Sequence, residues 1–219
     1  MTNTYSSEAF IIRPDAKKIG LISDTHVPDR AKSIPKKLNY LFKNVDLILH
    51  AGDITAPGVL DELADIAECF AVRGNNSGDK KRFAPPLSKV MTVELAHEFR
   101  LRIFHGVENF FQRVMDNAVG RAGFFPIASQ MVFKRVQKYS DNVDGLLFGH
   151  CHWPFIRKHR DVIYVNPGRG FKKSESSCGI LTLKEQQIEI QILPLGAKGR
   201  LAEIMEQKHV FGWHKKALS

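Results

Sequence analysis

The sequence predicts a mixed α/β fold, because strand-like and helix-like segments follow one another in two distinct arrangements. In the N-terminal half, short apolar runs alternate with segments whose apolar residues recur at helical spacing. Such alternation favours parallel strands joined by crossovers. In the C-terminal part, strand-like runs follow one another with turns between them, which favours antiparallel pairing. We therefore expect a domain built on mixed sheets, in which ligands gather at the carboxyl ends of the strands.

The expected strands are short runs rich in β-branched and aromatic residues that are bounded by turn residues. The fourth and fifth of them lie close enough in the chain to form a hairpin. The runs cover residues 17–23, 45–52, 67–74, 88–95, 99–106, 143–150, 161–168, 178–184 and 186–195.

The expected helices lie between these runs. Residues 33–45 and 56–68 carry apolar residues at helical spacing, with Thr55 as a plausible N-cap of the second helix and Pro57 in its first turn. Residues 107–141 form a long, largely helical segment that is interrupted near its middle by glycine, phenylalanine and proline. The first dozen residues are expected to be a loose terminal segment.

The composition is that of one globular domain over residues 1–219, with 43% hydrophobic and 25% charged residues. The start of the chain lacks the features of a signal peptide, and no apolar run approaches the length that spans a membrane. No membrane partner is therefore expected. The three cysteines, Cys69, Cys151 and Cys178, are odd in number and widely spaced, which argues against a disulfide framework and favours the cytoplasm.

The net charge of +9 has two explanations. It suits a phosphate-rich partner, either nucleic acid or a small phosphorylated substrate, and it equally suits a solvated basic surface. The lysines and arginines are scattered along the chain, and no segment matches a nucleic-acid-binding motif. Charge is thus the only support for nucleic acid, and nothing in the sequence indicates an oligomeric state.

Potential metal ligands follow the carboxyl ends of five expected strands. Singly, each has an ordinary structural explanation as a turn residue, a helix cap or a hydrogen-bonded histidine. Together they would lie at one edge of a sheet, where burying so much polarity without a purpose is costly. Their mixed nitrogen and oxygen donors suit two divalent ions of Mn, Fe, Ni or Zn better than a calcium or magnesium site. The residues are Asp24, His26, Asp53, Asn75, His105, His150 and His152.

Two neighbours of these residues are expected to play supporting parts. At the exit of a strand, alternate residues point to opposite sides, so His150 and His152 can both face the ions while Cys151 faces away and packs. His50 lies three residues before Asp53, and strand alternation and the intervening glycine place it differently from Asp53. We interpret His50 as a structural residue that supports the ligands.

The segments DTH, GD, GNN, HG and GHCH occur in this order and resemble the metal-binding motifs of the calcineurin-like metallophosphoesterase superfamily. The small bacterial and archaeal phosphodiesterase branch is the most similar, and NPGR at residues 166–169 resembles its Asn-Pro-Gly-Ser element. The resemblance spans roughly residues 17–195. It implies a four-layer αββα sandwich of two stacked mixed β-sheets flanked by helices, with residues 107–141 as a helical cap insertion.

The resemblance also implies two ion sites that share a bridging ligand. Mn²⁺ is the expected metal at both sites, and Fe, Ni or Zn are alternatives. One site would be held by Asp24, His26 and His152, the other by Asn75, His105 and His150, with Asp53 as the bridge. The implied catalytic residues are Asp53, Asn76 and His105.

The third motif departs from the superfamily pattern. Many members have a histidine where this chain has Asn76, which can donate a hydrogen bond to substrate but cannot supply a proton at pH 7. We therefore expect weaker help for poor leaving groups. The Asp that usually closes this motif is replaced by Ser77, and Asp79 could take its place.

Residues 107–141 leave two possibilities open. As a cap, the segment would supply substrate specificity, with arginines such as Arg113 and Arg121 contacting phosphate. Alternatively, its aromatic residues pack and its arginines face solvent.

The motifs together imply a metal-dependent phosphoesterase, specifically a phosphodiesterase. It would hydrolyse a phosphate ester by in-line attack of a hydroxide held by two ions. A nucleotide-sugar pyrophosphatase or a phosphomonoesterase of the same superfamily is the first alternative. A non-catalytic interaction scaffold, like the phosphoesterase-like subunit of the retromer coat, is the alternative from another class. The complete set of ligands argues for catalysis.

Overall fold

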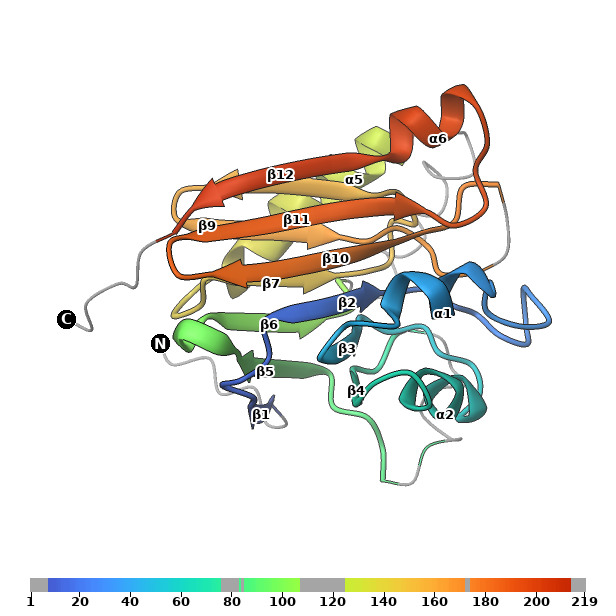
Figure 1. Ribbon diagram of the computed structural model, residues 1–219, viewed down its shortest axis with the longest axis horizontal. Helices are drawn as coiled ribbons and strands as arrows, with labels where there is room; N and C mark the ends of the chain where they lie inside the picture. The colour runs from blue at the N-terminus through green and yellow to red at the C-terminus, as the bar shows by residue number, and fades with distance from the viewer. Residues whose placement is uncertain (1–7, 76–82, 84, 107–124, 172–173, 214–219) are drawn as a thin grey trace.

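The computed structural model describes residues 8–75, 83, 85–106, 125–171 and 174–213 (Figure 1). Two six-stranded mixed sheets lie face to face, and helices cover parts of their outer faces, so the expected αββα sandwich is confirmed. We call the sheet with strand order β1-β5-β6-β7-β9-β8 the first sheet and the sheet with order β12-β11-β10-β2-β3-β4 the second sheet. Within the described ranges, no helix combines the length and the apolar character needed to cross a membrane.

The first sheet contains the expected hairpin and the central part of the chain. β5 and β6 pair antiparallel, as predicted, while β6, β7 and β9 run parallel to one another. Its strands are β1 (Glu8–Ile12), β5 (Val90–Glu94), β6 (Arg100–Phe104), β7 (Gly145–Phe148), β8 (Phe155–His159) and β9 (Val162–Asn166).

The second sheet joins the start of the chain to its end. β2, β3 and β4 are parallel, and β10 pairs antiparallel with both β2 and β11, as predicted. The expected antiparallel pairing in the C-terminal part was wrong for β7 and β9, which run parallel in the first sheet. Its strands are β2 (Lys18–Ile22), β3 (Leu47–His50), β4 (Cys69–Ala71), β10 (Ser177–Lys184), β11 (Gln187–Pro194) and β12 (Gln207–Gly212).

Three apolar clusters hold the layers together. Between the sheets, residues such as Leu21 and Leu49 pack with Ile103 and Leu147. The described helices are short: α1 (Lys37–Phe42), α2 (Gly58–Ala64), α5 (Phe125–Val136), α6 (Arg200–Met205) and the 3-10 turns η1 (Ala96–Glu98) and η2 (Gln137–Tyr139). α1 and α2 pack on the outer face of β2 and β3, and α5 packs on the outer face of the first sheet.

The described part of residues 107–141 behaves as a packing element. From α5, the buried side chains of Val132, Phe133 and Val136 join the cluster on the first sheet that includes Phe148. Residues 107–124, which hold Arg113 and Arg121, lie outside the described residues. The cap interpretation of that part therefore stays a prediction.

Two local predictions were wrong, and β8, β12 and α6 were missed. The first dozen residues are not wholly loose, because β1 pairs in parallel with β5 and packs the partly buried Ala9 and Ile11 against the core. Thr55 does not cap α2: the helix begins at Gly58 after Pro57, and the Thr55 hydroxyl donates to the carbonyl of Val27 instead.

Candidate metal centre

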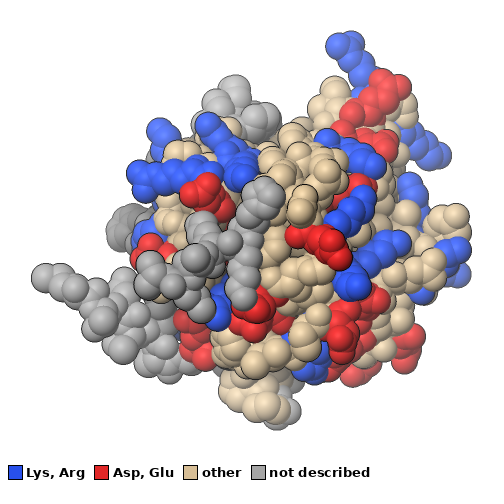
Figure 2. Space-filling model, turned by 60° about the vertical axis from the view of Figure 1, so that its left-hand side comes forward, with Lys and Arg blue, Asp and Glu red and all other residues tan. Residues whose placement is uncertain are grey.

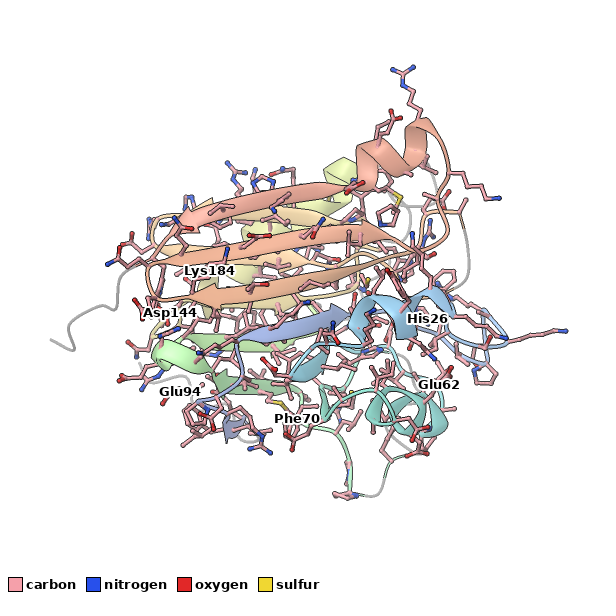
Figure 3. The ribbon with its side chains drawn as sticks, in the orientation of Figure 1. His26, Glu62, Phe70, Glu94, Asp144 and Lys184 are labelled. Atoms are coloured by element: carbon pink, nitrogen blue, oxygen red, sulfur yellow. The ribbon has the colours of Figure 1, made fainter. Side chains whose placement is uncertain are left out.

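The seven predicted ligands lie at one end of the two stacked sheets. Asp24 and His26 follow β2, Asp53 follows β3 and Asn75 follows β4, all in the second sheet. His105 follows β6, and His150 and His152 follow β7, in the first sheet. Figure 3 shows His26 at this end of the strands. Because both sheets end here, side chains from distant parts of the sequence can face one another.

Three of these residues form a first group of facing donor atoms. Asp24 Oδ1 lies 3.2 Å from His152 Nε2 and 4.0 Å from His26 Nε2. The two histidine nitrogens are 3.3 Å apart. Asp24 and His26 are buried and His152 is half-buried. A carboxylate oxygen and two imidazole nitrogens that meet in this way have the spacing of ligands around one divalent ion.

A second group forms around His105. Its Nε2 lies 3.3 Å from Asp53 Oδ2 and 3.8 Å from Asp24 Oδ1. The same Asp53 oxygen lies 3.4 Å from His26 Nε2, so it faces both groups. This position suits the bridging role expected of Asp53. Asp24 also reaches both groups, whereas the sequence had placed it at one ion only.

Asn75 and His150 complete the arrangement. Asn75 Nδ2 contacts His150 Nδ1 at 3.2 Å, and the rings of His150 and His105 have centroids 5.4 Å apart. The structure thus brings all seven predicted ligands into one connected cluster. Asn76 and Asp79 lie outside the described residues.

The buried histidines have their ring atoms directed by the backbone. His105 Nδ1 donates to the carbonyl of Ala51 at 2.8 Å, which leaves Nε2 to face the carboxylates. Among the residues that the structure describes, His105 Nε2 is buried and makes no well-aligned hydrogen bond, although Asp53 Oδ2 lies 3.3 Å away. Burying a nitrogen in this way is costly unless something binds it. The donor set therefore fits divalent ions, which these nitrogen and oxygen atoms would hold.

The carboxylates make the cluster attractive to positive charge. Burial opposes protonation of His105, but Asp53 and Asp24 outweigh burial and raise the His105 pKa to about 10. Burial alone would raise the Asp24 pKa, but the neighbouring His152 and His105 outweigh burial. The Asp24 pKa is therefore lowered, and Asp24 stays ionised. For His26, burial dominates over the same two carboxylates and lowers the pKa to about 4. A neutral imidazole is the form that binds a metal, so His26 has the required form, whereas an ion that binds His105 would displace its proton.

His50 lies behind the cluster, as expected for a structural residue. Its Nε2 contacts the hydroxyl of Thr25 at 3.1 Å, and its Nδ1 accepts from the backbone N–H of Gly52 at 3.1 Å. Burial lowers the His50 pKa to about 3. Both ring nitrogens are thus engaged by the loops that carry Asp24 and Asp53.

The ligand loops adopt an uncommon backbone conformation. A positive φ costs about 1–3 kcal/mol for a residue other than glycine, and such residues cluster at functional sites. Five of the seven ligands have it: Asp24 (52°), His26 (46°), Asp53 (59°), His150 (74°) and His152 (59°). We infer that the surrounding structure holds these residues in place for function.

Two glycines, whose packing the sequence did not reveal, allow the loops to approach one another. A Cβ atom on Gly74 would lie 2.1 Å from Asp53 Oδ1, and one on Gly149 would lie 2.8 Å from Asp24 Oδ2. Each glycine directly precedes a ligand, in the segments RGN and FGH, which is the signal that could have identified it.

Cys151 points away from the ligands, as its alternation with His150 and His152 predicts. Its buried side chain belongs to the apolar cluster under α5, and its sulfur lies 3.0 Å from Asn166 Nδ2. None of the three cysteines, which all lie in the described part of the chain, forms a disulfide.

The chain is similar to known proteins in both sequence and fold. The calcineurin-like phosphoesterase superfamily domain matches residues 18–186. A probable metallophosphoesterase of Methanothermobacter thermautotrophicus is 32% identical over 181 residues, which cover 82% of this chain and 93% of the relative. A phosphodiesterase of Methanocaldococcus jannaschii is 25% identical over 182 residues, which cover 78% of this chain and 95% of the relative.

Solved structures with low identity share the fold. Vacuolar protein sorting 29 of Cryptosporidium parvum has a TM-score of 0.64 at 17% identity, covering 91% of this chain and 100% of its own. The zinc complex of the Entamoeba histolytica protein of the same name has a TM-score of 0.62 at 17% identity, covering 89% and 98%. With a domain match that includes every predicted ligand and a relative at 32% identity over most of its length, the chain belongs to the calcineurin-like phosphoesterase superfamily.

Proposed function

We propose that the protein is a metal-dependent phosphodiesterase that hydrolyses a small phosphorylated substrate. The observation that carries this proposal is the position of Asp53 Oδ2, which lies 3.4 Å from His26 Nε2 and 3.3 Å from His105 Nε2. One carboxylate oxygen between two buried imidazoles suits a ligand that bridges two ions. Membership of the superfamily and the relative named a phosphodiesterase support the same activity.

The proposed cofactors are two divalent ions, with Mn²⁺ as the first choice and Fe, Ni or Zn as alternatives. When bound, such a pair lowers the pKa of a water molecule and neutralises charge on the phosphate. His26, His152 and Asp24 would hold one ion, and His105, His150 and Asn75 the other. The neutral imidazole and amide ligands matter here, because only the two aspartates reduce the positive charge that an anionic ester requires.

The chain's own residues would orient the reaction. Asp53 and Asp24 link the two groups of donors, because an oxygen of each carboxylate lies within 4.0 Å of both His26 Nε2 and His105 Nε2. His105 is held by the Ala51 carbonyl so that its Nε2 faces these two carboxylates. Asn76 follows Asn75 in the sequence and is proposed to donate a hydrogen bond to the substrate phosphate. Since an amide supplies no proton at neutral pH, we expect esters with good leaving groups to react faster.

The distribution of charge supports a small substrate rather than nucleic acid, because the lysines and arginines are scattered along the sequence. Figure 2 shows a face that turns away from the metal centre, and there lysine and arginine side chains are interspersed with acidic ones. A reducing compartment such as the cytoplasm fits the free thiols of Cys69, Cys151 and Cys178.

Two other functions are alternatives to the phosphodiesterase. A nucleotide-sugar pyrophosphatase or phosphomonoesterase would use the same ions on another ester. A non-catalytic scaffold is suggested by the fold shared with vacuolar protein sorting 29. The complete set of seven donors in this chain, five of them buried, favours an enzyme over a scaffold.

The test is hydrolysis of bis-p-nitrophenyl phosphate and p-nitrophenyl phosphate by Mn²⁺-loaded protein, wild type and Asp53→Asn. We expect the wild type to prefer the diester and the variant to be inactive. Asp46→Asn is the matched control, because Asp46 lies at the opposite end of β3 and an amide oxygen can still accept from the N–H groups of Lys17 and Lys18. The assay is repeated with Fe, Ni and Zn in place of Mn²⁺. Absence of hydrolysis with all four metals would refute the proposal of an enzyme, and a preference for the monoester would refute the diesterase assignment.

A further inference from the structure

The metal centre depends on contact between two sheets that share no strand. Its ligands come from β2, β3 and β4 of the second sheet and from β6 and β7 of the first sheet. Sliding of one sheet over the other would separate His152 from Asp24, which are now 3.2 Å apart. Something at this end of the sandwich must therefore fix the two sets of loops against each other.

Residues 166–171, which we call the connecting loop, contact the histidine loop of the first sheet. The Asn166 side chain is fully buried at the end of β9. Its Nδ2 donates to the carbonyl of Gly149 at 2.7 Å and to Cys151 Sγ at 3.0 Å, and its Oδ1 accepts from the N–H of Gly168 at 2.8 Å. Asn166 thus binds the residues on either side of His150, through the backbone of Gly149 and the side chain of Cys151.

The same loop contacts the first ligand loop of the second sheet. The Ser23 hydroxyl donates to the carbonyl of Gly168 at 2.6 Å, and the N–H of Gly170 donates to the carbonyl of Ser23 at 2.7 Å. Ser23 directly precedes Asp24. The connecting loop is therefore hydrogen-bonded to the loops that carry ligands from both sheets.

Phe171 ends the connecting loop and packs against both histidines of the first group. Its ring stands edge-on to His26, with centroids 5.8 Å apart, and to His152, at 6.0 Å. One of these histidines belongs to each sheet. The ring is fully buried, so it limits how far either imidazole can turn.

We infer that Asn166 is a positioning residue for the metal centre, which holds the loop of His150 and His152 in register with the loop of Asp24 and His26. The inference deepens the proposed function, since it concerns how the proposed ions are held. Residues that orient metal ligands without touching the metal typically change metal affinity by about 10–100-fold when they are mutated. We expect a loss of this size when the Asn166 amide is removed.

The experiment measures Mn²⁺ affinity by calorimetry and Mn²⁺ coupling by electron paramagnetic resonance for wild type, Asn166→Ala, Ser23→Ala and Thr92→Val. Thr92 is the control because its buried hydroxyl makes a comparable hydrogen bond, to Glu8, between β5 and β1. We expect Asn166→Ala to bind Mn²⁺ at least tenfold more weakly and to lose the exchange-coupled signal of a two-ion centre. Thr92→Val should change neither, even if it lowers the melting temperature of the metal-free protein. Ser23→Ala keeps the test possible if Asn166→Ala fails to fold, and it should weaken Mn²⁺ binding through the other end of the loop.

The outcomes separate this inference from the proposed function. Equal Mn²⁺ affinity in wild type and both loop variants would overturn the positioning role and leave the proposed function standing. A wild type that binds two coupled Mn²⁺ ions but hydrolyses no ester would overturn the proposed function and leave the positioning role. Losses in Thr92→Val as large as those in Asn166→Ala would also overturn the positioning role, because they would reflect general stability.

Discussion

The backbone N–H of His150 donates to the carboxylate of Asp24, at 3.0 Å to Oδ2 and 3.2 Å to Oδ1. This contact joins the end of β7 in the first sheet to the end of β2 in the second sheet. Asp24 is therefore both a proposed ligand and the acceptor of a hydrogen bond between the sheets. The two roles can be separated, because an amide oxygen can accept the same hydrogen bond without carrying a charge.

Asp24→Asn is expected to keep the fold and lose the metal. The Asn oxygen can still accept from His150, so the circular dichroism spectrum should be unchanged. We expect the affinity for Mn²⁺, measured by calorimetry, to fall more than about 100-fold, since even residues that only orient ligands cost about 10–100-fold. A variant that binds Mn²⁺ as tightly as the wild type would show that Asp24 holds only the loops.

The three residues from 150 to 152 are expected to respond differently to substitution. His150→Ala and His152→Ala should each lose more than about 100-fold of the hydrolysis rate, because each removes a ligand. Cys151→Ser should keep the rate within a few-fold, since the sulfur lies in the apolar cluster under α5. Steady-state kinetics on the diester would decide. Loss of Mn²⁺ binding in Cys151→Ser would mean that the ligand set is wrong.

Gly74→Ala is expected to disturb both stability and metal binding. The new methyl group would meet Asp53 Oδ1 at 2.1 Å and Asp53 N at 2.2 Å, so the backbone must shift. Overpacking of this kind costs about 1–3 kcal/mol, which urea unfolding would measure. Gly58→Ala is the control, because nothing lies within 4 Å of its added Cβ at the start of α2, and it should be neutral or slightly stabilising. Equal unfolding free energies for the two variants would contradict the close approach.

The metal-free protein is expected to lose stability as the pH falls below neutrality. Burial lowers the His50 pKa from 6.5 to about 3, so between these values the unfolded chain binds a proton that the native protein does not. Going from pH 7 to pH 5, this one group should lower the free energy of unfolding by about 2 kcal/mol. His26 acts in the same direction, and His105, whose pKa is raised to about 10, acts in the opposite direction by a smaller amount.

His50→Gln isolates the contribution of His50. Urea unfolding at pH 7 and pH 5 should show a smaller pH-dependent loss in the variant than in the wild type, whatever its absolute stability. An identical loss in both proteins would mean that His50 contributes nothing to the acid sensitivity.

The clustering of the seven candidate ligands could be predicted from the sequence because each follows a recognisable apolar strand. Once parallel strands are expected, the carboxyl ends of neighbouring strands must meet, so Asp24 and Asp53 fall together without further information. The pairing of β1 with β5 could not be predicted in this way. Its five residues are too few to show a pattern, and only the partner strand, far along the chain, makes them a strand.

The contacts between loops also could not be predicted from local sequence patterns. Thr55 has the hydroxyl of a helix cap, but this hydroxyl donates to the carbonyl of Val27 in the loop after His26. The residues next to Thr55 in the sequence do not indicate this partner. The role inferred for Asn166 depends on how the two sheets stack. That stacking depends on packing across the core, which the sequence pattern of a single strand does not reveal.

The left-handed backbone at five of the ligands bears on which metal the protein acquires. These conformations fix the direction in which each of the five donor side chains leaves the backbone. Mixed imidazole, amide and carboxylate donors accept several divalent metals, and the choice among them then follows availability. Protein purified from cells grown in different media is therefore expected to carry different metals on the same scaffold.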